Sequence, residues 1–141
     1  MVKGGSRRVL IVEDHADLLN VMVDLVESWG HTVRSAADGE QALAIALAWQ
    51  PHVVCLDLVL PRMNGLEVAR RIVAAFSHDR PDDRPVLIAV TGRSGDIDRE
   101  LASAAGFDAF FAKPDHIDLL RQVLGGDPPL PATVPAAKGR G

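Results

Sequence analysis

Apolar and polar residues alternate along the chain in blocks that predict five strands and five helices. The strand candidates are short apolar runs at about residues 8–12, 31–35, 52–57, 86–90 and 107–112. The helix candidates lie between and after them, at about 16–29, 38–49, 64–75, 96–105 and 115–124. Strands that alternate with helices of this size predict right-handed βαβ units and a parallel sheet covered on both faces. We therefore expect a single-domain, doubly wound α/β fold with a five-stranded parallel sheet.

The segment 38–49 fits two patterns. Leu43, Ile45 and Leu47 alternate with alanines, which is also typical of a strand. Asp38 followed by Gln41 resembles a capping box, and alanine has the highest helix propensity. We therefore predict a helix in this segment.

Both ends of the chain differ in composition from the repeating part. Residues 1–7 resemble a flexible leader, and residues 126–141 are rich in Pro, Ala and Gly. Such a composition buries too little apolar surface to order itself, so we predict a disordered tail or linker stub there. The folded domain is expected to span residues 8–125.

Composition narrows the classes of protein to consider. Of 141 residues, 48% are hydrophobic and 24% charged, which is typical of a globular domain. The net charge of −4 does not suggest nucleic-acid binding. Cys55 is the only cysteine, so an intrachain disulfide is excluded, and we expect a buried thiol. We find neither a membrane span nor a signal peptide and expect a cytoplasmic location.

Four of the apolar runs are followed by polar or charged residues. Glu13 and Asp14 follow the first run, and Asp57, Thr91 and Lys113 follow or end the third, fourth and fifth. The carboxyl ends of parallel strands share one edge of the sheet, where such folds place their sites. The sequence therefore predicts that these side chains gather in one crevice.

Three carboxylates brought together repel one another, and protonation or a cation must relieve the repulsion. Carboxylate oxygens favour Mg²⁺, or the similar Mn²⁺, and Mg²⁺ commonly leaves positions for phosphate oxygens. The alternative is that Glu13 and Asp14 only begin a loop and cap the following helix. Taken alone, Thr91 is more typical of a strand or cap residue, and Lys113 of a surface lysine.

Pro114 keeps Lys113 out of the helical region, so that Lys113 continues the direction of its strand. From there its ammonium could pair with Asp57, or with a phosphoryl oxygen when one is present. The Thr91 hydroxyl could donate a hydrogen bond to another phosphoryl oxygen. Phosphoryl transfer needs mainly positioning and charge neutralisation, which these groups can supply.

Five short motifs occur in order, each separated by whole strand–helix units. They are Val9–Asp14, Leu56–Gly65, Val90–Gly92, Ala105–Asp108 and the pair Lys113-Pro114. With these motifs the chain resembles the receiver domain of two-component response regulators over about residues 7–125. The resemblance implies a (βα)₅ flavodoxin-like fold.

The resemblance also implies the roles of the site residues. Asp57 would accept a phosphoryl group from a partner phosphohistidine, and the receiver would catalyse only its own phosphorylation and dephosphorylation. Asp14 would bind Mg²⁺ directly and Glu13 through water, with Asp57 and the Val59 backbone carbonyl as further ligands. Thr91 and Lys113 would bind the phosphoryl oxygens.

In this family the threonine and an aromatic residue of the fifth strand move together on phosphorylation. Phe110 occupies the aromatic position and, without a hydroxyl, could act as a switch only by packing; a plain core phenylalanine is the alternative. Val59 and Arg93, each two residues after a site residue, are hypothesised to tune the lifetime of the phosphoryl group. Unchanged dephosphorylation rates in Val59→Asn and Arg93→Ala would contradict that hypothesis.

The resemblance implies a sensor histidine kinase or phosphotransfer protein as partner, together with an unidentified downstream protein. The switching surface would be the fourth helix, fifth strand and fifth helix, roughly residues 94–124, through which a homodimer could also form. The chain would be a stand-alone regulator or a fragment of a hybrid kinase. Two alternatives are a pseudo-receiver that binds proteins without phosphorylation and a Mg²⁺-dependent phosphatase. The phosphatase is disfavoured because Val59 stands where such enzymes usually carry a second Asp.

Overall fold

The structure is a computed structural model that describes residues 6–58, 60, 63–79, 84–91, 98–113 and 115–124. The side chains of residues 77–79, 91, 98 and 99 are not among those described. The predicted tail and the first five residues of the predicted leader lie outside the described residues.

The described residues form five strands and five helices in strict alternation. The strands are β1 (Arg8–Val12), β2 (Thr32–Ala36), β3 (Val53–Asp57), β4 (Val86–Thr91) and β5 (Ala109–Ala112). The helices are α1 (Ala16–Ser28), α2 (Gly39–Trp49), α3 (Gly65–Asp79), α4 (Asp98–Ala105) and α5 (His116–Leu124). The predicted order of elements is confirmed, and the ambiguous segment 38–49 is a helix. None of the described helices is both long and apolar enough to cross a membrane.

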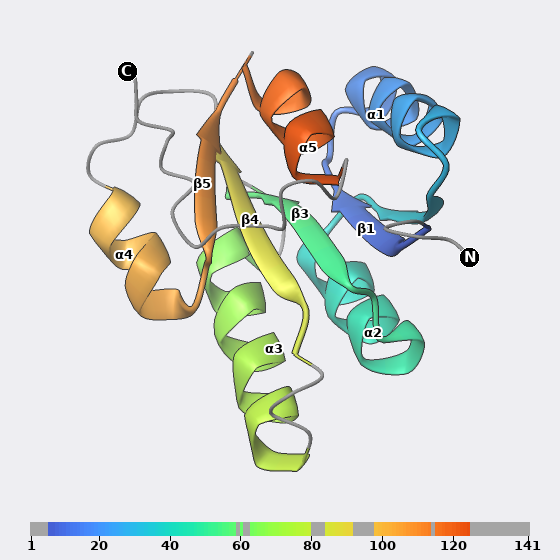
Figure 1. Cartoon of the computed structure of the whole chain (residues 1–141). Coiled ribbons are helices and arrows are strands. Elements are labelled where there is room, and N and C mark those ends of the chain that lie inside the picture. Colours follow the sequence, from blue (N-terminus) through green and yellow to red (C-terminus); the bar gives the residue numbers. More distant parts are fainter. Residues whose placement is uncertain are drawn as a thin grey trace.

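All five strands are parallel and follow the order β2-β1-β3-β4-β5 across the sheet (Figure 1). The chain first moves from β1 outward to β2 and then returns to the other side of β1 to form β3. This reversal creates a topological switch point between the carboxyl ends of β1 and β3, where doubly wound folds have their crevice. The fold thus places the residues that follow these two strands at this switch point.

The sheet carries a separate apolar core on each face. Strand residues that point to one face pack against α2, α3 and α4, among them Leu10, Val54 and Leu87. Their neighbours on the strands, such as Val9 and Val53, point to the other face and pack against α1 and α5. The two helical layers lie on opposite sides of the sheet (Figure 1). Burial on both faces explains why the central strands are continuous apolar runs.

Among the described residues, two element boundaries differ from the sequence prediction by two residues or more. Helix α3 continues to Asp79 rather than ending near residue 75, because Phe76 lies one turn beyond Ile72 and extends the buried stripe. Strand β5 begins at Ala109 rather than at residue 107. The amide of Phe107 donates to the Ala102 carbonyl, closing the end of α4 and removing this residue from the strand.

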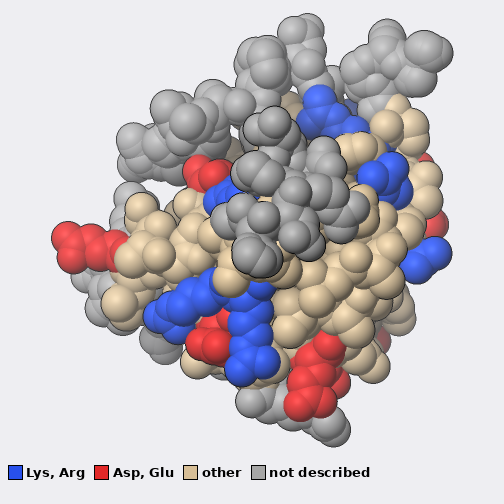
Figure 2. Space-filling view, turned by 90° about the horizontal axis from the view of Figure 1, so that it is seen from below, with Lys and Arg blue, Asp and Glu red and all other residues tan. Residues whose placement is uncertain are grey.

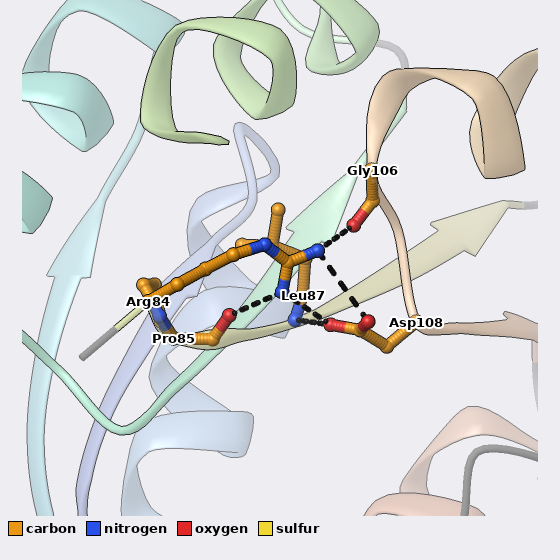
Figure 3. A network of polar contacts seen from close by, with 5 residues as sticks. All are labelled: Arg84, Pro85, Leu87, Gly106 and Asp108. Atoms are coloured by element: carbon orange, nitrogen blue, oxygen red, sulfur yellow. Dashed lines mark hydrogen bonds and ion pairs between the residues drawn. The ribbon is translucent and has the colours of Figure 1, made fainter. Parts of the chain in front are cut away.

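The amino-terminal edge of the sheet is held by a polar network around Arg84 (Figure 3). Its guanidinium donates to the Gly106 carbonyl, the Pro85 carbonyl and the Asp108 carboxylate. The Asp108 carboxylate also accepts from the amide of Leu87 at 2.8 Å. The network ties the end of α4 to the first residues of β4. Seen from below, a group of described basic side chains adjoins an acidic one, and the other described charged side chains are scattered (Figure 2).

Candidate functional site

Three carboxylates meet at the carboxyl ends of β1 and β3. One ligand oxygen from each of Glu13, Asp14 and Asp57 lies within 4.8 Å of the other two. Glu13 and Asp57 are 3% and 7% exposed, respectively, whereas Asp14 is exposed. Two of the three acids are therefore buried at the sheet edge, and the third is open to solvent.

Backbone hydrogen bonds fix the segments that carry these acids. The amide of Glu13 donates to the Ala36 carbonyl, and the amide of Leu58 donates to the Val90 carbonyl. The Glu13 side chain accepts a hydrogen bond from the amide of His15 at 3.1 Å. His15 itself is exposed and caps α1, accepting from the amide of Leu18. Glu13 thus has one oxygen held by the backbone while the other faces the cluster.

Lys113 lies directly after β5 and reaches across the sheet edge to the acids. Its ammonium is 3.0 Å from Glu13 Oε1 and 3.2 Å from Asp57 Oδ2. The pairing with Asp57 was expected from the sequence, but the contact with Glu13, 100 residues away, was missed. No local signal points to Glu13 as the second partner, because Glu13 follows β1, which is separated from β5 by β3 and β4 in the sheet.

The electrostatics of the site follow from this packing. Desolvation lowers the pKa of Lys113, but its bonds to Glu13 and Asp57 outweigh that effect and raise the pKa above its ordinary value. Lys113 therefore carries its positive charge at neutral pH.

Burial, reinforced by Asp57 and Glu13, raises the pKa of the Cys55 thiol to about 12. Cys55 therefore stays protonated, consistent with its expected place in the core.

The remaining predicted residues are described only in part. Thr91 ends β4, in register with Ala112 on β5, which places its backbone at the same edge of the sheet; its side chain is not described. Val59 and Arg93 lie outside the described residues. Phe110 is half-buried and packs against the core beneath α2, α3 and α4. Their predicted roles remain predictions.

The acid cluster has the donors that a magnesium ion requires. Carboxylate oxygens are its preferred protein ligands, and the ion commonly retains several waters. The exposed Asp14 leaves a path for such an ion from solvent, while the buried pair Glu13 and Asp57 already share a positive neighbour in Lys113. The residues present therefore fit Mg²⁺.

Comparison with known proteins identifies the family to which this chain belongs. The family profile described as "Response regulator receiver domain" matches residues 9–124. The chain therefore belongs to the response regulator receiver domain family of two-component systems.

Individual relatives include a sensor protein and a DNA-binding response regulator. The virulence sensor protein BvgS of Bordetella bronchiseptica is 37% identical over 84% of this chain. The DNA-binding response regulator MtrA of Mycobacterium tuberculosis is 31% identical over 77% of it. The chain spans only 10% of BvgS and 44% of MtrA, so the likeness concerns one domain of each.

A solved structure of another protein has a fold similar to that of this chain. It is the receiver domain of the sensor histidine kinase PA1611 from Pseudomonas aeruginosa, with a magnesium ion coordinated in its active-site cleft. The TM-score is 0.73 at 29% identity, covering 85% of this chain and 95% of that domain. The predicted flavodoxin-like receiver fold is thereby confirmed.

Proposed function

We propose that this receiver is a phosphoacceptor, and that Asp57 takes a phosphoryl group from a phosphohistidine on a partner protein. The observation that carries the proposal is the contact of one lysine with two buried acids beside a third, exposed acid. A module used only for protein binding would have no chemical need to gather three like charges at one point. This argues against the pseudo-receiver alternative.

The proposed reaction is an in-line transfer. An oxygen of the Asp57 carboxylate attacks phosphorus, and the phosphorus–nitrogen bond to the donor imidazole breaks as the new oxygen–phosphorus bond forms. The electron pair of the broken bond stays on the imidazole, which takes up a proton. The Lys113 ammonium and the Thr91 hydroxyl would hold two oxygens of the transferred group by charge-assisted hydrogen bonds.

Glu13, Asp14 and Asp57, with the backbone carbonyl of Val59, would hold Mg²⁺, or Mn²⁺ in its place. When bound, the ion neutralises charge on the transferring group. The chain's own contribution is to hold Glu13 and Asp57 in place through backbone bonds and Lys113. We further propose that Thr91 and Phe110 carry the change to α4, β5 and α5, and that Val59 and Arg93 influence how long the phosphoryl group persists.

The proposed partners follow from the relatives rather than from a contact in the structure. A sensor histidine kinase or a phosphotransfer protein would supply the phosphoryl group in the cytoplasm. The surface of α4, β5 and α5 would then bind a downstream protein or a second copy of the chain. BvgS and MtrA represent the two settings, a sensor protein and a DNA-binding regulator, in which such a domain occurs.

The test is phosphorylation by a small donor. Incubation with acetyl phosphate and Mg²⁺ should add a single phosphoryl group, detectable by intact mass, and Asp57→Asn should abolish the addition. Asp24→Asn is the matched control, because Asp24 is an exposed aspartate on α1 and should leave the addition unchanged. A folded wild-type chain that never gains the phosphoryl mass would contradict the proposal and favour the pseudo-receiver. Continuous hydrolysis of generic phosphate esters would instead favour the phosphatase.

A further inference from the structure

Two helices near the site begin with a glycine directly after a capping residue. Asp38 precedes Gly39 at the start of α2, and its carboxylate accepts from the amide of Gln41 at 2.9 Å. Asn64 precedes Gly65 at the start of α3, and its side chain accepts from the amide of Glu67 at 3.0 Å. Glycine has no side chain that could contribute to either cap, and it has a lower helix propensity than alanine. Something other than helix formation therefore requires glycine at both positions.

Gly65 lies against the backbone of the proposed phosphoacceptor. A Cβ atom at this position would lie 2.7 Å from the Asp57 carbonyl oxygen and 2.9 Å from Leu58 Cα, closer than real Cβ contacts. The amide of Gly65 also donates to the Leu58 carbonyl at 3.1 Å. The first residue of α3 thus rests directly on the peptide that follows Asp57.

Gly39 makes a similarly close contact, with Met63. A Cβ atom there would lie 2.5 Å from the Met63 carbonyl oxygen and 2.7 Å from Met63 Cβ. The side chain of Met63 packs against the core on the same face of the sheet. The start of α2 therefore rests against Met63, two residues before Gly65, while Gly65 itself rests against the backbone of Asp57 and Leu58.

We propose that Gly65 is a positioning residue for the phosphoacceptor Asp57, and that Gly39 assists it by holding Met63, two residues before Gly65. The proposal deepens the function proposed above. The Leu58 amide is bonded to the Val90 carbonyl at 3.0 Å, so a methyl group at position 65 would push on a peptide anchored to β4. The displacement would pass to Asp57, whose carboxylate must keep its spacing from Glu13, Asp14 and Lys113.

The experiment compares Gly65→Ala with wild type in the full chain, using two readouts. The first is the Kd for Mg²⁺, measured by calorimetry or by an NMR titration without any phosphoryl donor. The second is the rate of phosphorylation by acetyl phosphate at saturating Mg²⁺. Because displacing a reacting group by about 1 Å can cost about 100-fold, we expect a rate loss of at least about tenfold. The Mg²⁺ Kd should rise by about fivefold or more, as disturbed support of metal ligands usually causes.

Gly106→Ala is the matched control. Gly106 has a φ of +110°, and a Cβ there would lie 2.5 Å from Val73 Cγ2, so this variant is also strained and overpacked. It lies at the opposite edge of the sheet, in the Arg84 network. We expect it to lower the midpoint of urea unfolding while the Mg²⁺ Kd and the phosphorylation rate stay within about twofold of wild type.

Gly39→Ala provides the second test and should change both readouts in the same direction as Gly65→Ala, by a smaller factor. The proposal is overturned if folded Gly65→Ala keeps both values within about twofold of wild type, or if Gly106→Ala changes them equally. It is also overturned if Gly65→Ala fails to fold where Gly106→Ala folds, since the contact would then serve the fold. If wild type binds Mg²⁺ but takes no phosphoryl group, the proposed function fails, while the Mg²⁺ Kd still decides the role of Gly65.

Discussion

At the scale of single residues, the site depends on one ammonium group that contacts two buried acids. The side chains of Glu13 and Asp57 are 4% and 9% exposed, and both contact the ammonium of Lys113. Burying a carboxylate is costly unless an opposite charge or hydrogen bonds accompany it. Lys113 therefore stabilises the domain whenever no metal ion occupies the acid cluster.

Replacing Lys113 with methionine tests this role. The variant keeps an unbranched apolar stem but leaves two buried acids without the ammonium. The free energy of unfolding should fall by about 1–3 kcal/mol in the absence of divalent ions, less than for a fully buried pair because Lys113 is 24% exposed. Saturating Mg²⁺ should then stabilise the variant more than it stabilises wild type. Urea unfolding with and without MgCl₂ measures both effects.

Arg71→Met is the control for that experiment. Arg71 pairs with Glu67 at 2.9 Å on α3, but its side chain is 54% exposed. Such surface pairs contribute little, so the unfolding free energy should change far less than in Lys113→Met. An equal loss in both variants would show that the acid cluster does not depend on Lys113.

At the scale of elements, α2 ends in an unusual conformation. Gln50, which follows the helix, has a φ of 56° and is the only described residue other than glycine with a positive φ. Its amide still donates to the Ala46 carbonyl, and its own carbonyl accepts from the Arg8 guanidinium at 2.7 Å. The left-handed conformation is therefore held by backbone contacts, which any residue type could make.

Gln50→Gly should stabilise the protein, because glycine adopts this conformation without steric cost and keeps both backbone contacts. The expected gain is about 0.5–1 kcal/mol, measured as the change in unfolding free energy in urea. The same substitution inside a helix should have the opposite sign. Gln122→Gly, at an exposed position of α5, should therefore destabilise by about 0.5–1 kcal/mol. A loss of stability in Gln50→Gly would disprove the conformational argument.

At the scale of the whole molecule, two histidines hold the start of β1 at the edge opposite the acid cluster. The Nδ1 atom of His31 accepts from the amide of Arg7 at 3.1 Å, and that of His52 accepts from the amide of Arg8 at 2.9 Å. Both bonds require an imidazole whose Nδ1 carries no proton. Desolvation, with a further contribution from the nearby arginines, lowers the pKa of both histidines.

This arrangement predicts a loss of stability in mild acid. Because the folded pKa of each histidine lies below its ordinary value of 6.5, protons bind the unfolded chain more readily. The histidine contribution is therefore complete above about pH 7 and is lost as the pH falls below about 6.5. His31, which is 8% exposed, should contribute more than the solvent-exposed His52.

The measurement is the unfolding free energy between about pH 7.5 and 5.5 for wild type and for His31→Gln. The variant should show a shallower decline, because glutamine does not titrate in this range. His52→Gln is the comparison variant, since His52 makes the same kind of bond but is solvent-exposed, so its substitution should change the slope less than His31→Gln does. Identical slopes for wild type and His31→Gln would show that this histidine does not couple proton binding to folding.

Sequence patterns were reliable where the deciding interaction is local. The cap at Asp38 correctly indicated a helix over a segment whose apolar pattern also fitted a strand. The end of α3 was misplaced, because the burial of Phe76 depends on what lies across from it. Likewise, β5 was predicted two residues too long, because Phe107 bonds back to α4 instead of continuing the strand.

By itself, the sequence determined the order of strands and helices, the parallel sheet, and the edge at which Glu13, Asp14, Asp57 and Lys113 gather. These features follow from apolar periodicity and from residues that lie directly after strands, which a chain displays locally. Only the tertiary structure decided that Lys113 contacts Glu13 as well as Asp57, and that Gly65 must lie flat on the peptide following Asp57. Such choices depend on how strands distant in sequence align, and on contacts of a few ångströms that no local pattern encodes.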